Sequence, residues 1–228
     1  MGIFSFIKSS LSEEKLTANL VNYVYDSVQD DKGIRVEDAL CVISTIVAER
    51  CIEVANEYSI NEHEFEPGSA VFSEKMNEVL IGPVAVESWN DLPAESVFAK
   101  IKEKIKRHYE DESFPSLIGI FEDYAGNVGE TEWGKVPLSI PDDHKPTFFP
   151  LQVGYETRKF IEKNIDLESK EKTLQIAINA IAQILIEVKA AMDPALTLTL
   201  TFELINGMAK TATMTDKKVA ELKAEMKK

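Results

Sequence analysis

The chain has few of the residues that build covalent or catalytic sites: two cysteines, three histidines and ten glycines among 228 residues. Cys41 and Cys51 lie in one segment with helical periodicity. Ten residues of helix rise about 15 Å, which is too far for a disulfide between the two. Because their neighbours are apolar, we expect two buried free thiols, which fit a reducing cytoplasm.

The sequence also lacks the short motifs of nucleotide or hydrolytic chemistry. It has no Gly-x-Ser-x-Gly turn, no glycine loop ending in Lys-Ser or Lys-Thr, and no Gly-x-Gly-x-x-Gly turn. We therefore predict no cofactor. The most apolar segment, residues 167–192, is interrupted by polar residues four apart, which favours a buried core helix over a membrane span.

Positive charge is scarce. There are 39 acidic and 25 basic residues, so the net charge is 25 − 39 = −14. Residues 49–95 hold 11 acidic side chains against Arg50 and Lys75, a local charge of −9. This charge disfavours nucleic acids as partners, because their binding depends on cations that neutralise phosphate. The same field attracts a protein with a basic surface. The simpler interpretation of the acidic segment is a solvated face that only keeps the chain soluble.

Helical periodicity dominates what is present. Apolar residues recur three or four positions apart in most of the chain, which predicts a mainly α fold, a bundle of roughly six to nine helices. The predicted helices cover about 11–30, 36–58, 69–81 or 73–81, 91–109, 116–124, 155–164, 167–192, 194–206 and 215–228. Ser10, three residues before Glu13, has the spacing of a capping box for the first of them.

Two segments are ambiguous. Residues 196–204 alternate leucine or phenylalanine with threonine, which is typical of a strand, but their helical flanks favour a helix. Residues 110–150 hold five of the nine prolines and four of the ten glycines, which predicts an irregular segment. A minor β element is expected there, as short strands at 136–140 and 148–153.

We expect one compact domain over residues 1–228. Its sub-parts would be a helical half at 11–109, a loop-rich crossover at 110–150 and a second helical half at 155–228. A long ordered loop inside a compact chain is often functional, so the crossover is a candidate for contacts with a partner.

The favoured function is a non-catalytic, protein-binding or regulatory module that uses an acidic face. Its acidic residues would steer a basic partner, and apolar residues of the loop or of the N-terminus would supply the buried contact. The candidate partner-binding residues are Glu62, Glu64, Glu66, Glu74, Glu78, Trp133, Phe148 and Phe149.

Two alternatives stay open. The first is an enzyme or metal-dependent protein with a carboxylate–histidine site, for which the weak candidates are His63, His144, Asp142 and Asp143. Their spacing matches no known ligand motif, so no metal is predicted. The second is a peripheral membrane protein anchored by the N-terminal apolar residues Ile3, Phe4, Phe6 and Ile7.

Overall fold

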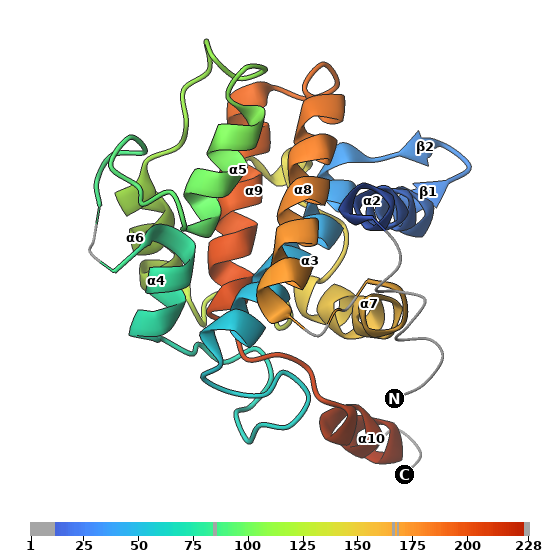
Figure 1. Ribbon diagram of the computed structural model, residues 1–228. Coiled ribbons are helices and arrows are strands. Elements are labelled where there is room, and N and C mark those ends of the chain that lie inside the picture. The colour runs from blue at the N-terminus through green and yellow to red at the C-terminus, as the bar shows by residue number, and fades with distance from the viewer. Residues whose placement is uncertain (1–11, 84–85, 166, 168, 226–228) are drawn as a thin grey trace.

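The computed structural model describes residues 12–83, 86–165, 167 and 169–225, and this part of the chain is mainly α-helical (Figure 1). Its elements are α2 (Glu13–Val28), β1 (Gln29–Asp30), β2 (Gly33–Ile34), α3 (Val36–Ala55), α4 (Glu74–Ile81), α5 (Val97–Ile105), α6 (Leu117–Asn127), the 3₁₀ turn η1 (Asp142–His144), α7 (Pro150–Asn164), α8 (Lys170–Val188), α9 (Pro194–Ala209) and α10 (Asp216–Glu225). The predicted fold class is confirmed.

Serine side chains begin several of these helices. Each accepts a hydrogen bond from the backbone amide three residues later, which satisfies one of the donors that a first turn leaves unpaired. The capping serines are Ser12, Ser73, Ser96, Ser116 and Ser169. Ser12 therefore does what the sequence predicted for Ser10, which lies outside the described residues. Asp193 caps α9 in the same way, with Pro194 at the first helical position.

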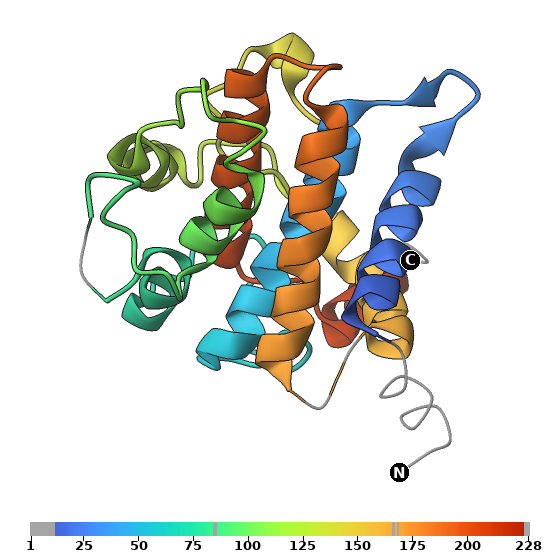
Figure 2. The ribbon, with the colours of Figure 1, turned by 45° about the horizontal axis from the view of Figure 1, so that its top comes forward.

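Helix α3 is the centre of the molecule. It is buried over most of its circumference and packs against α8, α9 and α7, with α2 and α4 also in contact (Figure 2). In this view α2 and α7 lie on one side of the centre, and α4, α5 and α6 lie on the other. One hydrophobic cluster runs through these helices from Leu16 to Met214. Cys41 and Cys51 are buried in it as free thiols, and burial raises the pKa of both.

The two ambiguous segments resolve differently. Residues 196–204 lie within α9, so the helical interpretation is correct. The predicted strand at 148–153 is wrong, because Pro150 begins α7 and fixes a φ angle suited to a first helical turn. The predicted strand at 136–140 is also wrong. That segment packs on α9, where the missing side chain of Gly207 makes room for Val136, and it pairs with no other strand of the described residues.

Some boundaries differ from the prediction. Helix α6 continues through Gly126 to Asn127, beyond the predicted end at residue 124. Helix α5 starts only at Val97, after the Ser96 cap, and Pro93 lies before it. Helix α3 ends at Ala55 because Asn56 adopts a left-handed conformation with φ 53°. In the part of the chain that the structure describes, none of the helices combines the length and the apolar character that crossing a bilayer requires.

Candidate functional site

Residues 56–73, hereafter the acidic loop, connect α3 to α4 and are fixed to the segment that follows α9. The amide of Gly68 donates to the carbonyl of Ala212 at 2.9 Å, and the amide of Ala212 donates back to the carbonyl of Ser69 at 2.8 Å. The amide of Val71 donates to the carbonyl of Lys210 at 2.7 Å. These bonds form a short antiparallel ladder, so the loop has a defined position without being part of a sheet.

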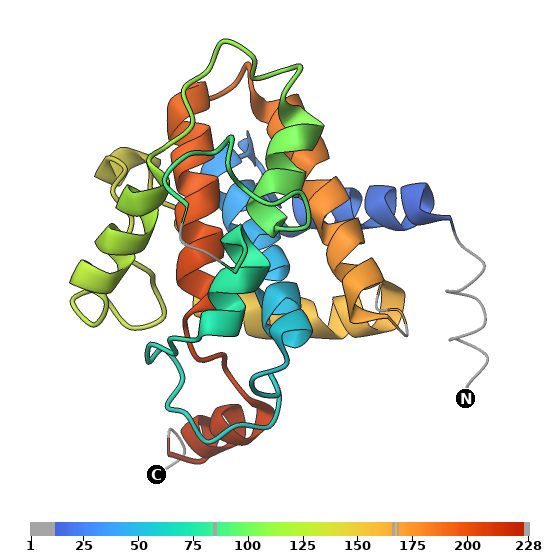
Figure 3. The same ribbon diagram turned by 60° about the vertical axis from the view of Figure 1, so that its left-hand side comes forward.

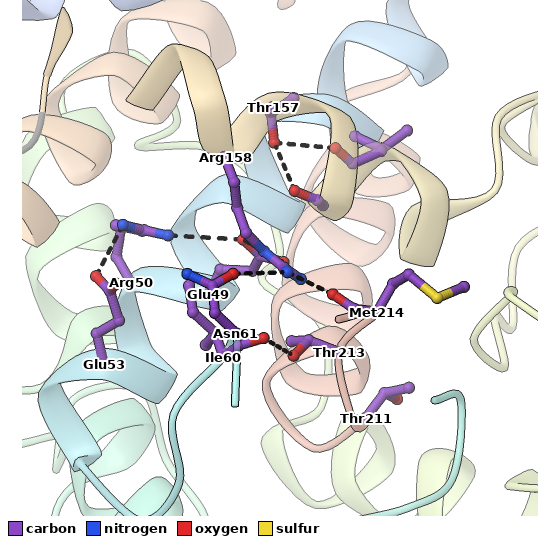
Figure 4. A network of polar contacts seen from close by, with 12 residues as sticks. Glu49, Arg50, Glu53, Ile60, Asn61, Thr157, Arg158, Thr211, Thr213 and Met214 are labelled. Carbon is purple, nitrogen blue, oxygen red and sulfur yellow. Dashed lines mark hydrogen bonds and ion pairs between the residues drawn. The ribbon is translucent and has the colours of Figure 1, made fainter. Parts of the chain in front are cut away.

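A buried ion-pair network secures the other end of the acidic loop (Figure 4). Arg158 on α7 donates three hydrogen bonds to the carboxylate of Glu49 on α3, the shortest at 2.7 Å. The same guanidinium donates to Asn61 of the loop at 3.2 Å and to the carbonyl of Met214. Thr213 in turn donates to the carbonyl of Ile60 at 2.8 Å. One buried charge pair thus joins α3, α7, the loop and the C-terminal segment.

The predicted acidic residues are exposed on this loop and on the helix that follows it. Glu66 forms an ion pair with Lys218 of α10 at 2.8 Å. The carboxylates of the other four predicted residues have no lysine or arginine nitrogen within 4.0 Å among the described residues. These four are Glu62, Glu64, Glu74 and Glu78. Their charge is therefore available to a partner.

Trp133 lies against the acidic loop. Its side chain is 54% exposed, and its indole nitrogen donates to the carbonyl of Pro67 at 3.2 Å. Phe65 and Phe72 of the loop are also exposed, and the ring of Phe72 contacts Tyr124 of α6. We call the exposed set the acidic–aromatic face: Glu62, Glu64, Phe65, Glu66, Phe72, Glu74, Glu78 and Trp133. The elements that carry it face the viewer in Figure 3.

The other two predicted aromatic residues lie elsewhere. Phe149 is half-buried at the start of α7, where its ring packs against Gly134 and beneath the Lys135 ammonium at 5.0 Å. It therefore supports the turn that carries Trp133 instead of facing solvent. Phe148 lines a small pocket of about 180 Å³ between α2, α3 and α7. Neither residue belongs to the acidic–aromatic face.

The histidine candidates do not gather a metal-ligand set. His63 is hydrogen-bonded through Nε2 to Thr213, and burial lowers its pKa. His144 instead contacts Glu37 at 3.0 Å through Nδ1, while Asp142 pairs with Lys145 at 2.7 Å. Asp143 lies beside His144 in η1, and its carbonyl accepts from Arg35. Within the described ranges no three histidine, cysteine or carboxylate side chains are close enough to hold an ion.

A groove between α4 and α6 is the main feature that sequence reasoning missed. It measures about 540 Å³, its apolar wall includes Ile81, Leu117, Ile118 and Phe121, and Glu74, Glu78 and Glu122 line it too. A signal for it exists in the sequence: four apolar residues occupy positions 117, 118, 120 and 121 of one short helix. Because such a helix cannot bury every side against one neighbour, an exposed apolar side was to be expected.

The irregular segment encloses the other large cleft, of about 560 Å³. Its charged side chains bind one another: Lys135 pairs with Glu132, and Lys145 pairs with Asp142. Ser139 donates through its amide and its hydroxyl to the two carboxylate oxygens of Glu203, a buried residue of α9. Both oxygens of the Glu203 carboxylate are thus engaged in holding the loop, which is a structural arrangement.

Comparison with known proteins gives no family. No family model, curated protein or solved structure matches this chain. The membrane-anchor candidates Ile3, Phe4, Phe6 and Ile7 lie outside the described residues. The acidic–aromatic face and the adjoining α4–α6 groove are therefore the features on which a functional assignment can be based.

Proposed function

We propose that this chain is a non-catalytic binding protein that recognises a basic surface of another protein through its acidic–aromatic face. The observation that carries the proposal is the position of Trp133, which is hydrogen-bonded to Pro67 inside the acidic loop and still half exposed. A large aromatic side chain held against a loop that carries exposed carboxylates combines the apolar anchor and the charged surroundings of a typical interface.

The two kinds of residue have different roles. The carboxylates raise the rate at which a basic partner is encountered, and they repel acidic molecules. The aromatic side chains hold the partner once it has docked, because they bury a large area at a small cost in side-chain entropy. The anchoring of the loop limits the further ordering that binding would require. We place this activity in the cytoplasm, since both cysteines are free and buried.

A charge-reversal experiment with a matched control tests the proposal. The face variant replaces five glutamates with lysine: Glu62, Glu64, Glu66, Glu74 and Glu78. The control variant makes the same change at five exposed acidic residues away from the face: Glu13, Glu14, Asp26, Asp31 and Glu110. Each variant has a net charge of −14 + 10 = −4, so only the location of the change differs.

Both variants and the unmodified chain are used to capture partners from lysate of the source organism at low salt, and captured proteins are identified and cross-linked. We expect a protein that is retained by the unmodified chain and by the control variant but lost with the face variant, with cross-links near Trp133. A partner retained equally by all three proteins would contradict the proposal. Loss of the partner from both variants would assign the effect to net charge and not to this face.

A further inference from the structure

We propose that the α4–α6 groove binds an amphipathic basic helix of the partner protein, with apolar side chains seated against Ile118 and Phe121 and with lysine or arginine beside Glu74, Glu78 and Glu122. This inference rests on the proposed function and specifies the partner segment. The groove is continuous with the acidic–aromatic face, since Glu74 and Glu78 belong to both.

The wall of the groove is apolar because α6 has more apolar residues than its contact with α9 can bury. Leu117 and Ile120 are buried, whereas Ile118 remains 43% exposed. Phe121 is held in place by Lys210, whose ammonium nitrogen lies 3.6 Å from the ring centroid. The groove therefore has a preformed apolar surface, which is what an amphipathic helix requires of its binding site.

The dimensions fit two to three turns of helix. Helix α4 has 8 residues and α6 has 11, which correspond to about 12 Å and 16 Å of length. Apolar residues seven positions apart on a helix are separated by about 10 Å, so two such anchors can lie along the groove together.

The rim of the groove is acidic and available. Glu74, Glu78 and Glu122 are exposed, and in the described part of the chain no cationic side chain lies within 4.0 Å of their carboxylates. Three exposed carboxylates match a partner segment rich in lysine or arginine, and they oppose an acidic peptide, a nucleic acid or an anionic membrane.

Two lysine-containing helices of the described part of the chain, α5 and α10, do not meet these requirements. Helix α5 has a basic outer face, but its apolar residues Val97, Phe98, Ile101 and Ile105 are buried in the core. Helix α10 has three lysines and three acidic residues from Asp216 to Glu225, a net charge of 3 − 3 = 0. The charge of the rim thus favours a segment of a different protein over a second copy of this chain.

The test uses a fluorescent peptide of about 18 residues made of leucine, alanine and lysine, ordered so that the leucines form one face of a helix. A second peptide has the same composition in an order that scatters the leucines. The matched protein variants are I118R in the groove and I34R in the β-hairpin, since Ile118 and Ile34 are 43% and 42% exposed. Circular dichroism checks that both variants fold.

We expect the amphipathic peptide to bind the unmodified protein about tenfold or more tightly than the scattered peptide. I118R should weaken this binding by about tenfold, and I34R should change it by less than about twofold. Equal binding of the two peptides, or an equal effect of the two variants, would overturn the groove proposal. Sedimentation that shows self-association lost in I118R alone would also overturn it, in favour of a second copy.

A second pair of variants covers the case in which I118R does not fold. E74K combined with E122K alters the rim, and E13K combined with E14K makes the same charge change on α2; all four residues are exposed. Only the E74K and E122K pair should weaken the binding of the amphipathic peptide. The groove proposal fails alone if I118R and the rim pair leave peptide binding intact while the five-site face variant still loses its cellular partner. The proposed function fails alone if the peptide results hold and the cellular partner is retained by the face variant.

Discussion

Lys210 is a buried lysine without a counter-ion. It is 4% exposed, its side chain lies against Phe121, and no carboxylate oxygen is within 4.0 Å of its nitrogen among the residues described. Burial lowers the pKa of its ammonium group to about 7. At neutral pH the folded protein therefore holds this side chain close to the point where it loses its proton.

Replacing Lys210 with methionine should stabilise the protein at neutral pH. In the unfolded chain this lysine titrates near its ordinary pKa of 10.5, whereas in the folded protein it titrates near 7. The unfolded state therefore binds more protons between these values, and the destabilisation by Lys210 is full below pH 7 and disappears as the pH approaches 10.5. We expect the Lys210→Met variant to gain about 2 to 4 kcal/mol at pH 7.

Urea unfolding at pH 7 and at pH 9.5 measures this effect. The gain should shrink markedly at the higher pH, since the unmodified protein recovers stability there. Lys135→Met is the control, because that ammonium also lies over an aromatic ring but is well exposed. A gain that is independent of pH would contradict the assignment to Lys210 titration.

The Glu49–Arg158 pair predicts a large loss of stability when only one partner is changed. Glu49 is 2% exposed and also contacts the buried Arg50 at 3.6 Å, so Glu49→Gln leaves two guanidinium groups next to a neutral side chain. Removing one member of a buried pair typically costs about 3 to 5 kcal/mol. Glu57→Gln, which removes an exposed pairing with Lys75 at 3.9 Å, should cost less than about 1 kcal/mol.

Chemical denaturation of both variants tests this prediction. Similar denaturation midpoints would show that the buried pair contributes no more to stability than the exposed pair. Hydrogen exchange adds a positional readout. The amides of Gly68, Val71 and Ala212 should exchange faster in Glu49→Gln, because the network holds the segments that carry them.

At the scale of the residue, the sequence revealed the negative charge of the candidate site but not the contacts that hold its residues in place. The unpaired glutamates of the acidic loop follow from composition, because charged side chains in an irregular segment remain at the surface. The contact between Trp133 and Pro67 joins residues 66 positions apart, and the Arg158–Glu49 pair joins residues 109 apart. No periodicity relates residues at such separations, so these contacts appear only once the helices have packed.

At the scale of the element, helix capping and periodicity predicted most of the bundle. The alternation of leucine and threonine in 196–204 resembles a strand, yet the segment is helical. Thr197 and Thr201 satisfy their hydroxyls within the helix by donating to the carbonyls four residues earlier. Threonine can therefore be buried in an apolar helix, and almost every side of α9 is covered by neighbours. A buried helix has no polar face from which periodicity can be recognised.

Two glycines within helices predict opposite effects of the same substitution. Gly154 lets α7 approach α3, because a Cβ atom there would lie 2.5 Å from Oε1 of Glu49. A Cβ atom at Gly126 in α6 would meet nothing within 4 Å, so this glycine serves no close contact. Alanine is favoured over glycine in a helix by about 0.5 to 1 kcal/mol. We therefore expect Gly126→Ala to stabilise by this amount and Gly154→Ala to destabilise by about 1 to 3 kcal/mol through overpacking.

Thermal unfolding of the two variants beside the unmodified protein measures the difference. A gain in stability for Gly154→Ala would mean that α7 and α3 can separate without loss, which contradicts the packing described for the Glu49–Arg158 pair. A neutral result for Gly126→Ala would indicate that the C-terminal turn of α6 frays and gains nothing from a better helix former.

At the scale of the whole molecule, charge is distributed so that the acidic loop is only partly neutralised. The basic run of α5 does not compensate it: Lys102 binds Trp89 and Asn90, and Lys106 pairs with Glu103 on its own helix. Lys75 and Lys218 are the cations that pair with the loop in the described ranges. A net charge of −14 thus includes a persistent local field on the side that also exposes aromatic residues.

Salt dependence separates the two contributions to binding on this scale. Exposed charges are screened within about 8 Å at physiological ionic strength, whereas apolar contacts are not. Stopped-flow measurements with the amphipathic peptide should therefore show an association rate that falls steeply with added salt. The five-site face variant should associate more slowly at low salt, and its difference from the unmodified protein should vanish near 1 M salt.

Ile118→Ser should instead accelerate dissociation by about tenfold and leave the association rate within about twofold, because it removes apolar contact and no charge. Ile118→Ser is expected to leave association intact only if charge alone sets the association rate. If it slowed association as much as the face variant does, charge and apolar contact would not act on separate steps of binding. The electrostatic role of the acidic loop would then have to be abandoned.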